Sequence, residues 1–368
     1  MLRARWHAGQ QWLVLAAGLT ASGSVRRLRG DVLEEGFRSV RRASWATALV
    51  GLVLPLLALT FGGCSSNKVS LAASWPRAST EATVPAPIGA FTFPLTGLPI
   101  PPASSYPTAA ACVKVFDSGA AAAFQGIGDA DVIYETADSS KGTQLACIFQ
   151  SRMSGRIGPL SGAGMPDLWL LPQYHAALFS TGATGTLSAS FKRAGLYDLS
   201  DGSGAAGLAY VDVSRPASQT GTYLRADRAQ AELQKLSSSI ASESARLHFS
   251  ESVETTGSKT KSVTVPFSAS DIVEWSYDAR TKSYTRTRNS VPQRDLRSGQ
   301  RVTADNVVVM WAVYQEFDED TAGSGGFDVT LGGSGEVTVL REGERYDGKW
   351  RADGQSPPTF TDDQGGTR

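Results

Sequence analysis

Short apolar runs and helically spaced apolar positions alternate through the first folded region of the chain, residues 93–239. Apolar runs bounded by polar residues predict strands at 112–116, 131–135, 144–149, 176–180 and 208–212. Apolar residues at helical spacing predict helices at 165–174, 185–194 and 226–236. Strands and helices that interleave along a chain are typical of a layered α/β domain, so we predict one over this region.

The pattern changes to period-two alternation from residue 247 onward. Strands are predicted at 262–267, 272–277, 283–287, 306–317, 327–331, 336–340 and 344–350. We therefore predict a mainly β C-terminal domain over residues 247–368, and an α+β protein as a whole. Because no apolar residue follows Phe360, we expect poor order after about Gln355.

An uncharged apolar segment, residues 46–61, lies near the N-terminus and follows Arg41 and Arg42. Its sixteen residues are fewer than the ~20 that a membrane-spanning helix needs, and they suit the apolar region of a secretory signal peptide. The triplet Gly62-Gly63-Cys64 follows and resembles a bacterial lipobox. We interpret residues 1–63 as a signal-peptide region and Cys64 as the lipidated residue. A transmembrane anchor with an incidental cysteine is the alternative.

Two segments flank this signal. Residues 1–37 are longer than the start of a signal peptide requires, and we interpret them either as a start codon placed too early or as a long basic region. Residues 64–92 are rich in Ser, Ala, Pro and Thr, which predicts a flexible tether. Lipid on Cys64 would hold the folded region at the extracytoplasmic face of the cell membrane, with membrane lipid as its partner.

Several short motifs occur in a characteristic order between residues 93 and 363. They are 94–98 (Pro-Leu-Thr-Gly-Leu), 125–135, 157–159 (Ile-Gly-Pro), Tyr277-Asp278 with Tyr284 and Arg286, 305–309, 333–335 and 348–350. In this order and spacing the chain resembles the YerB-like family of bacterial lipoproteins. The resemblance implies an N-terminal layered α/β domain and a C-terminal β domain on a lipoprotein tether, and it implies no known reaction. Family members have a further strand after the segment that ends here, so the resemblance also implies that this β domain lacks its last strand.

The resemblance also places four polar residues where the family has a cleft, and we treat them as candidate ligand-binding residues: Asp117, Glu135, Asp138 and Thr143. Gln144 stands where the family usually has arginine, and residues 161–164 read Ser-Gly-Ala-Gly where it has two arginines. Arginine binds carboxylate or phosphate with a planar fork that these side chains do not reproduce. The resemblance therefore implies an altered site without its usual anion contacts.

The positions of the cysteine and histidine residues bear on disulfide bonding and on metal binding. After Cys64 the thiols are Cys112 and Cys147, each in a predicted apolar strand. Two interpretations are open, namely buried free thiols or a disulfide bond formed in an oxidising compartment. His175 and His248 lie in different predicted domains without metal-site spacing, so we expect no metal site and no cofactor.

The charge balance excludes one class of function, and the sequence leaves three others open. Lys+Arg and Asp+Glu are equal at 35 each, which argues against a nucleic-acid-binding protein. The leading interpretation is a non-catalytic binding protein of the cell envelope with an unidentified ligand or protein partner. One alternative is a cell-envelope enzyme, such as a wall-polymer hydrolase, that uses Asp117, Glu135 or Asp138 as its acid. A degenerate protein–protein scaffold is the other.

Overall fold

The computed structural model describes much of the chain beyond residue 91 and one segment near the N-terminus. The described residues are 12–20, 92–98, 100, 109–117, 119, 121, 124–138, 142–201, 210–213, 221–236, 247, 257–317 and 326–362. All of them belong to one compact unit. The predictions for the rest of the signal region, for Cys64 and for the tether at 64–91 lie outside the described residues.

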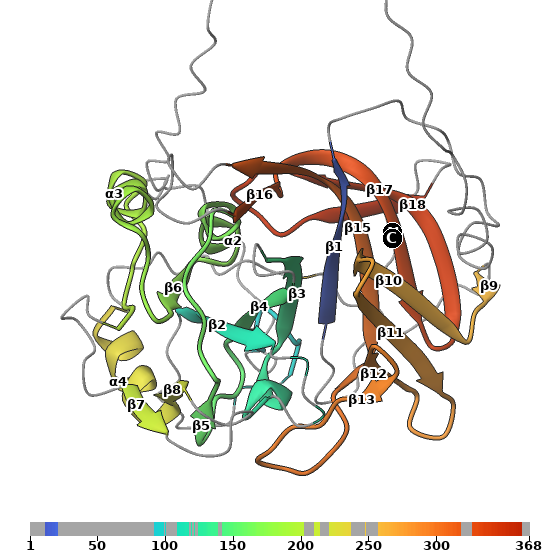
Figure 1. The fold of residues 1–368 in the computed structure, drawn as a ribbon, viewed down its shortest axis with the longest axis horizontal. Coiled ribbons are helices and arrows are strands. Elements are labelled where there is room, and N and C mark those ends of the chain that lie inside the picture. Colours follow the sequence, from blue (N-terminus) through green and yellow to red (C-terminus); the bar gives the residue numbers. More distant parts are fainter. Residues whose placement is uncertain are drawn as a thin grey trace, which may run out of the picture. The chain divides into compact units, whose positions relative to one another are not determined.

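A large mixed sheet contains most of the described strands (Figure 1). Its order is β19-β18-β17-β15-β1-β3-β4-β2-β6, with β16 paired to β15 and β9 paired to β18. The bounds are β1 Trp12–Thr20, β2 Ala110–Asp117, β3 Val132–Ala137, β4 Thr143–Phe149, β6 Ala176–Phe179, β9 Ser258–Lys259, β15 Asn306–Phe317, β16 Gly326–Thr330, β17 Gly333–Arg341, β18 Glu344–Ala352 and β19 Thr359–Asp362. Strand β1 therefore joins strands of the N-terminal and C-terminal regions into one sheet.

Two smaller sheets hold the remaining described strands. One contains β10 Ser262–Ser268, β11 Asp271–Asp278, β12 Ser283–Arg288, β13 Val291–Pro292 and β14 Thr303–Ala304; the other contains β5 Arg156–Ile157, β7 Tyr210–Val213 and β8 Gly221–Arg225. In β11, the alternating residues Val273 and Trp275 are buried, as the period-two pattern predicts. The prediction of a mainly β C-terminal region is confirmed.

Three α-helices occur among the described residues: α2 Asp167–Tyr174, α3 Gly185–Arg193 and α4 Ala226–Leu236. A short 3-10 helix, η1, spans Ile127–Asp129. The hydroxyl of Thr184 accepts a hydrogen bond from the backbone N–H of Leu187 at the start of α3, as an N-cap does. The apolar spacing in the sequence located each α-helix to within about two residues.

The predicted layered α/β architecture of residues 93–239 is wrong. The structure is mostly β, and the helices in this region are few and short. Strand β4 pairs antiparallel with both β3 and β2, and the parallel pair is β2 with β6. Antiparallel neighbours need no helical crossover between them. The interleaved order of elements along the chain therefore does not produce helices layered on a parallel sheet.

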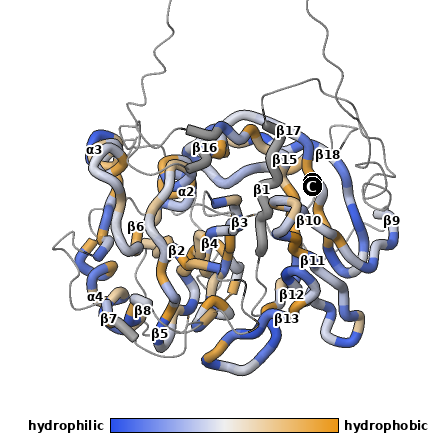
Figure 2. Tube along the Cα trace, in the orientation of Figure 1, coloured by the Kyte–Doolittle hydropathy of each residue, from blue (hydrophilic) through white to orange (hydrophobic). Residues whose placement is uncertain are grey.

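Side chains of the large sheet alternate between two hydrophobic clusters, one on each face. On the first face, Val307 of β15 belongs to a cluster that includes Trp275 of the β10–β14 sheet. On the second face, Val308 belongs to a cluster that includes Leu170 of α2. Figure 2 shows hydrophobic residues along β2, β4 and β15. The centre of the large sheet is thus buried on both sides.

Strand β19 differs from the expectation for the C-terminal residues. It pairs antiparallel with β18, from Thr359 opposite Arg351 to Asp362 opposite Gly348. Phe360 is partly buried against the second-face cluster. This one apolar side chain, together with the ladder of backbone hydrogen bonds, holds a strand where the sequence predicts poor order.

Candidate functional site

Three of the four candidate polar residues lie side by side on the first face of the large sheet. Asp117 ends β2, Thr143 begins β4 directly opposite it, and Glu135 lies in β3 opposite Leu145. Because side chains alternate along a strand, all three point toward the cluster that contains Leu145. None is more than 1% exposed. The three side chains therefore lie close together, and they lie inside the protein and not in an open cleft.

Arg286 of β12 contacts two of these residues from the opposite sheet. Its Nη2 atom donates to Asp117 Oδ2 at 2.8 Å and to Glu135 Oε1 at 2.5 Å. The hydroxyl of Thr143 also donates to Glu135 Oε1, at 2.8 Å. Arg286 is 1% exposed. A guanidinium group from the C-terminal region therefore forms ion pairs with two carboxylates of the N-terminal region.

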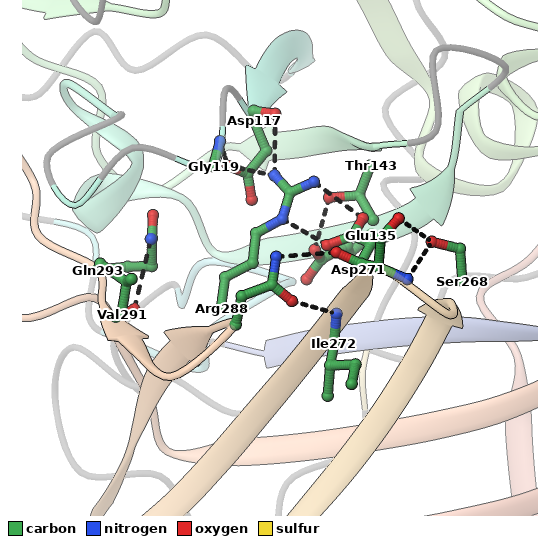
Figure 3. Close-up of polar contacts among 12 residues, drawn as sticks. Asp117, Gly119, Glu135, Thr143, Ser268, Asp271, Ile272, Arg288, Val291 and Gln293 are labelled. Atoms are coloured by element: carbon green, nitrogen blue, oxygen red, sulfur yellow. Dashed lines mark hydrogen bonds and ion pairs between the residues drawn. The ribbon is translucent and has the colours of Figure 1, made fainter.

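Arg288, two residues further along β12, extends the network (Figure 3). Its Nη1 atom lies 2.7 Å from Asp117 Oδ1 and donates to the Asp117 carbonyl at 2.9 Å. Its Nε and Nη2 atoms donate to the two carboxylate oxygens of Asp271 at 2.5 and 2.8 Å, a bidentate pair. We call the six residues of this network the junction cluster: Asp117, Glu135, Thr143, Asp271, Arg286 and Arg288.

The junction cluster contains three carboxylates and two guanidinium groups. Burial raises the pKa of Glu135, and the neighbouring Arg286 opposes that rise. Glu135 Oε2 and the Nε and Nη1 atoms of Arg286 are buried without a hydrogen-bond partner. A proton on Glu135 would bring the charge of the cluster to zero, which is the direction that burial favours.

A small cavity borders the junction cluster. Its lining includes Phe124, Trp275 and Val302 together with Glu135 and Arg286, and the centre of a water molecule has about 10 Å³ in which to move there. That space is on the scale of one water molecule. The junction cluster therefore has no room for a substrate, and its chemistry is that of a buried ion network between the N-terminal and C-terminal regions.

Asp138, the fourth candidate residue, is not part of the junction cluster. It follows β3, is only partly buried, and accepts a 3.3 Å hydrogen bond from Gln144 Nε2. Gln144 pairs with Phe116 across β2 and β4, in register positions that alternate with those of Asp117 and Thr143. The structure thus separates Asp138 and Gln144 from the other candidates.

Sequence reasoning missed two residues of the junction cluster, Arg288 and Asp271, and assigned no contact to Arg286. The available signal was the alternation in β12, where Tyr284, Arg286 and Arg288 occupy every second position and are all buried. Arginine residues that share a strand face with a buried tyrosine are candidates for an internal ion pair. The two partners of Arg286 lie about 170 and 150 residues away along the chain, so no local pattern identifies them.

Comparison with known proteins places the chain. Two domains of DUF3048, a family of proteins of unknown function, match the chain. The N-terminal domain of the family matches residues 95–240, and its C-terminal domain matches residues 263–368. "Putative lipoprotein YerB" of Bacillus subtilis (strain 168) is 24% identical over 235 residues, which are 61% of this chain and 68% of that protein. The chain belongs to the YerB-like family. A crystal structure of the YerB protein from Bacillus subtilis shares the fold, with a TM-score of 0.61 at 19% identity over 76% of this chain and 92% of that one.

In this YerB-like protein the thiols of Cys112 and Cys147 are both free and buried. Cys112 lies opposite Ile148 and Cys147 lies opposite Val113, so the two residues are one register position apart on paired strands. Their side chains therefore point to opposite faces of the sheet, where Cys147 packs in the first-face cluster and Cys112 in the second-face cluster. Of the two open interpretations, the structure has the buried free thiols.

Within the described ranges, no group of three or more His, Cys, Asp or Glu side chains is placed to hold a metal ion. His175 ends α2 with a left-handed backbone conformation, and His248 lies outside the described residues. No described helix has both the length and the apolar character needed to cross a bilayer.

We expect Glu135→Gln to change how stability depends on pH. Because the pKa of Glu135 is raised in the folded protein, its contribution to stability is fully present below the unfolded pKa of about 4.3 and is lost as pH rises through the folded pKa. Glutamine keeps the acceptor for Arg286 and Thr143 but does not titrate. Between pH 5 and pH 8, roughly the window above the unfolded pKa, the free energy of unfolding of the variant should fall less than that of the unchanged protein.

Chemical denaturation at a series of pH values measures this difference. Asp138→Asn is the matched control, because it removes a partly exposed carboxylate outside the junction cluster. Its pH profile should follow the unchanged protein. Parallel profiles for Glu135→Gln and the unchanged protein would contradict the raised pKa of Glu135.

Proposed function

We propose that this YerB-like protein is exported, is anchored by lipid on Cys64 to the extracytoplasmic face of the cell membrane, and binds a component of the cell envelope without catalysing a reaction. The anchor is supported by the apolar segment at 46–61, by the lipobox-like Gly62-Gly63-Cys64, and by the name "Putative lipoprotein YerB" of the Bacillus subtilis relative. Two or three acyl chains at ~0.8 kcal/mol per buried methylene hold a protein firmly to a bilayer.

The non-catalytic part of the proposal is supported above all by the burial of the junction cluster. A general acid must come within hydrogen-bond reach of its substrate. Asp117 and Glu135 are at most 1% exposed and are paired with arginine. An envelope hydrolase that used them would have to open the contact between two regions of the fold. Release of soluble fragments from isolated cell wall, abolished by Glu135→Gln, would contradict this part of the proposal.

We expect metabolic labelling with palmitate to test the anchor directly. The expressed protein should carry the label, and Cys64→Ala should lose it and leave the membrane fraction. Cys147→Ala is the matched control, because Cys147 is a fully buried thiol and its removal should leave both the label and the fractionation unchanged. Equal labelling of Cys64→Ala and the unchanged protein would contradict lipidation at Cys64.

A further inference from the structure

Strand β1 lies in the middle of the large sheet, between β15 and β3. It pairs in parallel with β15 over its whole length, from Trp12 opposite Asn306 to Thr20 opposite Tyr314. On its other side it pairs in parallel with β3, from Trp12 opposite Val132 to Leu15 opposite Glu135. Figure 1 shows β1 standing between β3 and β15. Among the described strands, β1 is the one that separates these two.

The two strands that flank β1 present apolar side chains to both faces of the sheet. In β3, Ile133 belongs to the first-face cluster and Val132 to the second. In β15, Val309 and Met310 divide in the same way. All four are at most 5% exposed. A strand covered on both faces is typically a continuous apolar run, and residues 12–20 (Trp-Leu-Val-Leu-Ala-Ala-Gly-Leu-Thr) are uncharged throughout.

In the proposed lipoprotein, β1 is removed from this position when the signal region is cleaved. The inference rests on that proposed function. Residues 12–20 precede the apolar segment at 46–61, and the basic residues before such a segment keep that side of it in the cytoplasm. Cleavage before Cys64 then removes residues 1–63 from the mature chain. The exported part would therefore carry β3 and β15 without the strand that lies between them here.

Two facing strand edges without a partner are a site for strand addition. Their backbone N–H and C=O groups need hydrogen-bond partners, and unpaired edges readily take a strand from another chain. We propose that the space between β3 and β15 in the exported protein is a strand-acceptor slot, and that it binds an uncharged, extended, apolar segment of a partner protein in parallel register with both strands. On the second face the slot is bordered by the apolar cluster that includes Val132, Val308 and Met310, so a charge on that side of the bound segment would have no counter-ion.

The register also sets a length and a composition for the bound segment. Nine residues of β15, Asn306 to Tyr314, are paired in the structure. The residues of β1 opposite Met310, Trp311 and Ala312 are Ala16, Ala17 and Gly18. We therefore expect a partner segment of about nine residues with small residues in its second half.

A peptide that spans residues 11–21 is the probe for the slot. The processed lipoprotein is extracted from membranes in detergent, and intact-mass measurement first establishes whether the chain begins at Cys64. Labelled peptide is then titrated and followed by fluorescence anisotropy. We expect saturable binding, and we expect a Val14→Asp peptide to bind at least about tenfold more weakly, because residue 14 lies between Tyr134 and Val308 of the second-face cluster and the variant would bury an unpaired charge there. No variant of the protein is needed, so impaired folding cannot imitate the result.

Hydrogen exchange shows where the peptide binds. Amides of 132–135 and 306–314 should gain protection when peptide is added, whereas those of β18, which does not contact β1 in the sheet order, should not. A chain that begins at Cys64 but does not bind the peptide would overturn the slot and leave the lipoprotein proposal standing. Protection of 306–314 by dimerisation alone would assign the slot to a second copy and overturn the partner segment. A chain that retains residues 1–63 would overturn both proposals.

Discussion

Arg286→Met is expected to lower the free energy of unfolding by about 3–5 kcal/mol, the usual cost of removing one partner from a buried ion network. Methionine fills a similar volume but provides no positive charge. Asp117, Glu135 and Asp271 would then face Arg288 alone. Denaturant unfolding followed by tryptophan fluorescence should show a lower midpoint with little change in slope, which is the signature of a loss of stability.

The control for this variant is Arg280→Met, in the turn between β11 and β12. Arg280 is 83% exposed and its contact with Asp278 is 3.5 Å long, so its removal should leave the midpoint unchanged. The double variant Arg286→Met with Glu135→Leu should recover part of the loss, because it removes a stranded carboxylate together with its partner. Equal midpoints for Arg286→Met and Arg280→Met would show that the junction cluster does not hold the two regions together.

Local patterns in the sequence predicted elements well and their arrangement poorly. The helices at 185–193 and 226–236 follow from apolar spacing. The pairing of β15 with β1, which lies about 300 residues earlier in the chain, is a non-local property that no window of sequence contains. An apolar run such as residues 12–20 reads equally well as part of a signal region and as a buried parallel strand.

From the sequence, only the acidic residues of the junction cluster in the N-terminal region could be identified as candidates, and its arginines could not. Asp117 and Glu135 stand at or near the ends of strands, where polar residues attract attention. Arg286 lies in a Thr-Arg-Thr-Arg segment that looks solvent-facing unless the buried Tyr284 on the same face is taken into account. The sequence alone does not distinguish acidic residues that line an open cleft from acidic residues that are buried in ion pairs with arginine. The distinction requires the position of the opposite sheet, which carries Arg286.

A second buried ion pair lies on the other face of the large sheet and gives the second large effect. Lys114 of β2 contacts Asp167, the first residue of α2, with Nζ 2.8 Å from Oδ1 and side-chain exposures of 2% and 0%. Asp167 Oδ2 also accepts a 2.8 Å hydrogen bond from the backbone N–H of Gly164. Asp167 therefore ties both α2 and the 161–164 loop to the sheet.

We expect Asp167→Asn to lower the free energy of unfolding by about 3–5 kcal/mol, because it leaves the Lys114 ammonium buried without a counter-ion. Lys114→Met alone should cost a similar amount, since it strands the Asp167 carboxylate. The double variant should be less destabilised than either single variant, because no buried charge is left unpaired, and denaturant midpoints of the four proteins measure this coupling. Strictly additive losses would mean that the two charges do not depend on each other, and that α2 is held to the sheet by apolar contacts such as those of Leu170 and Leu171.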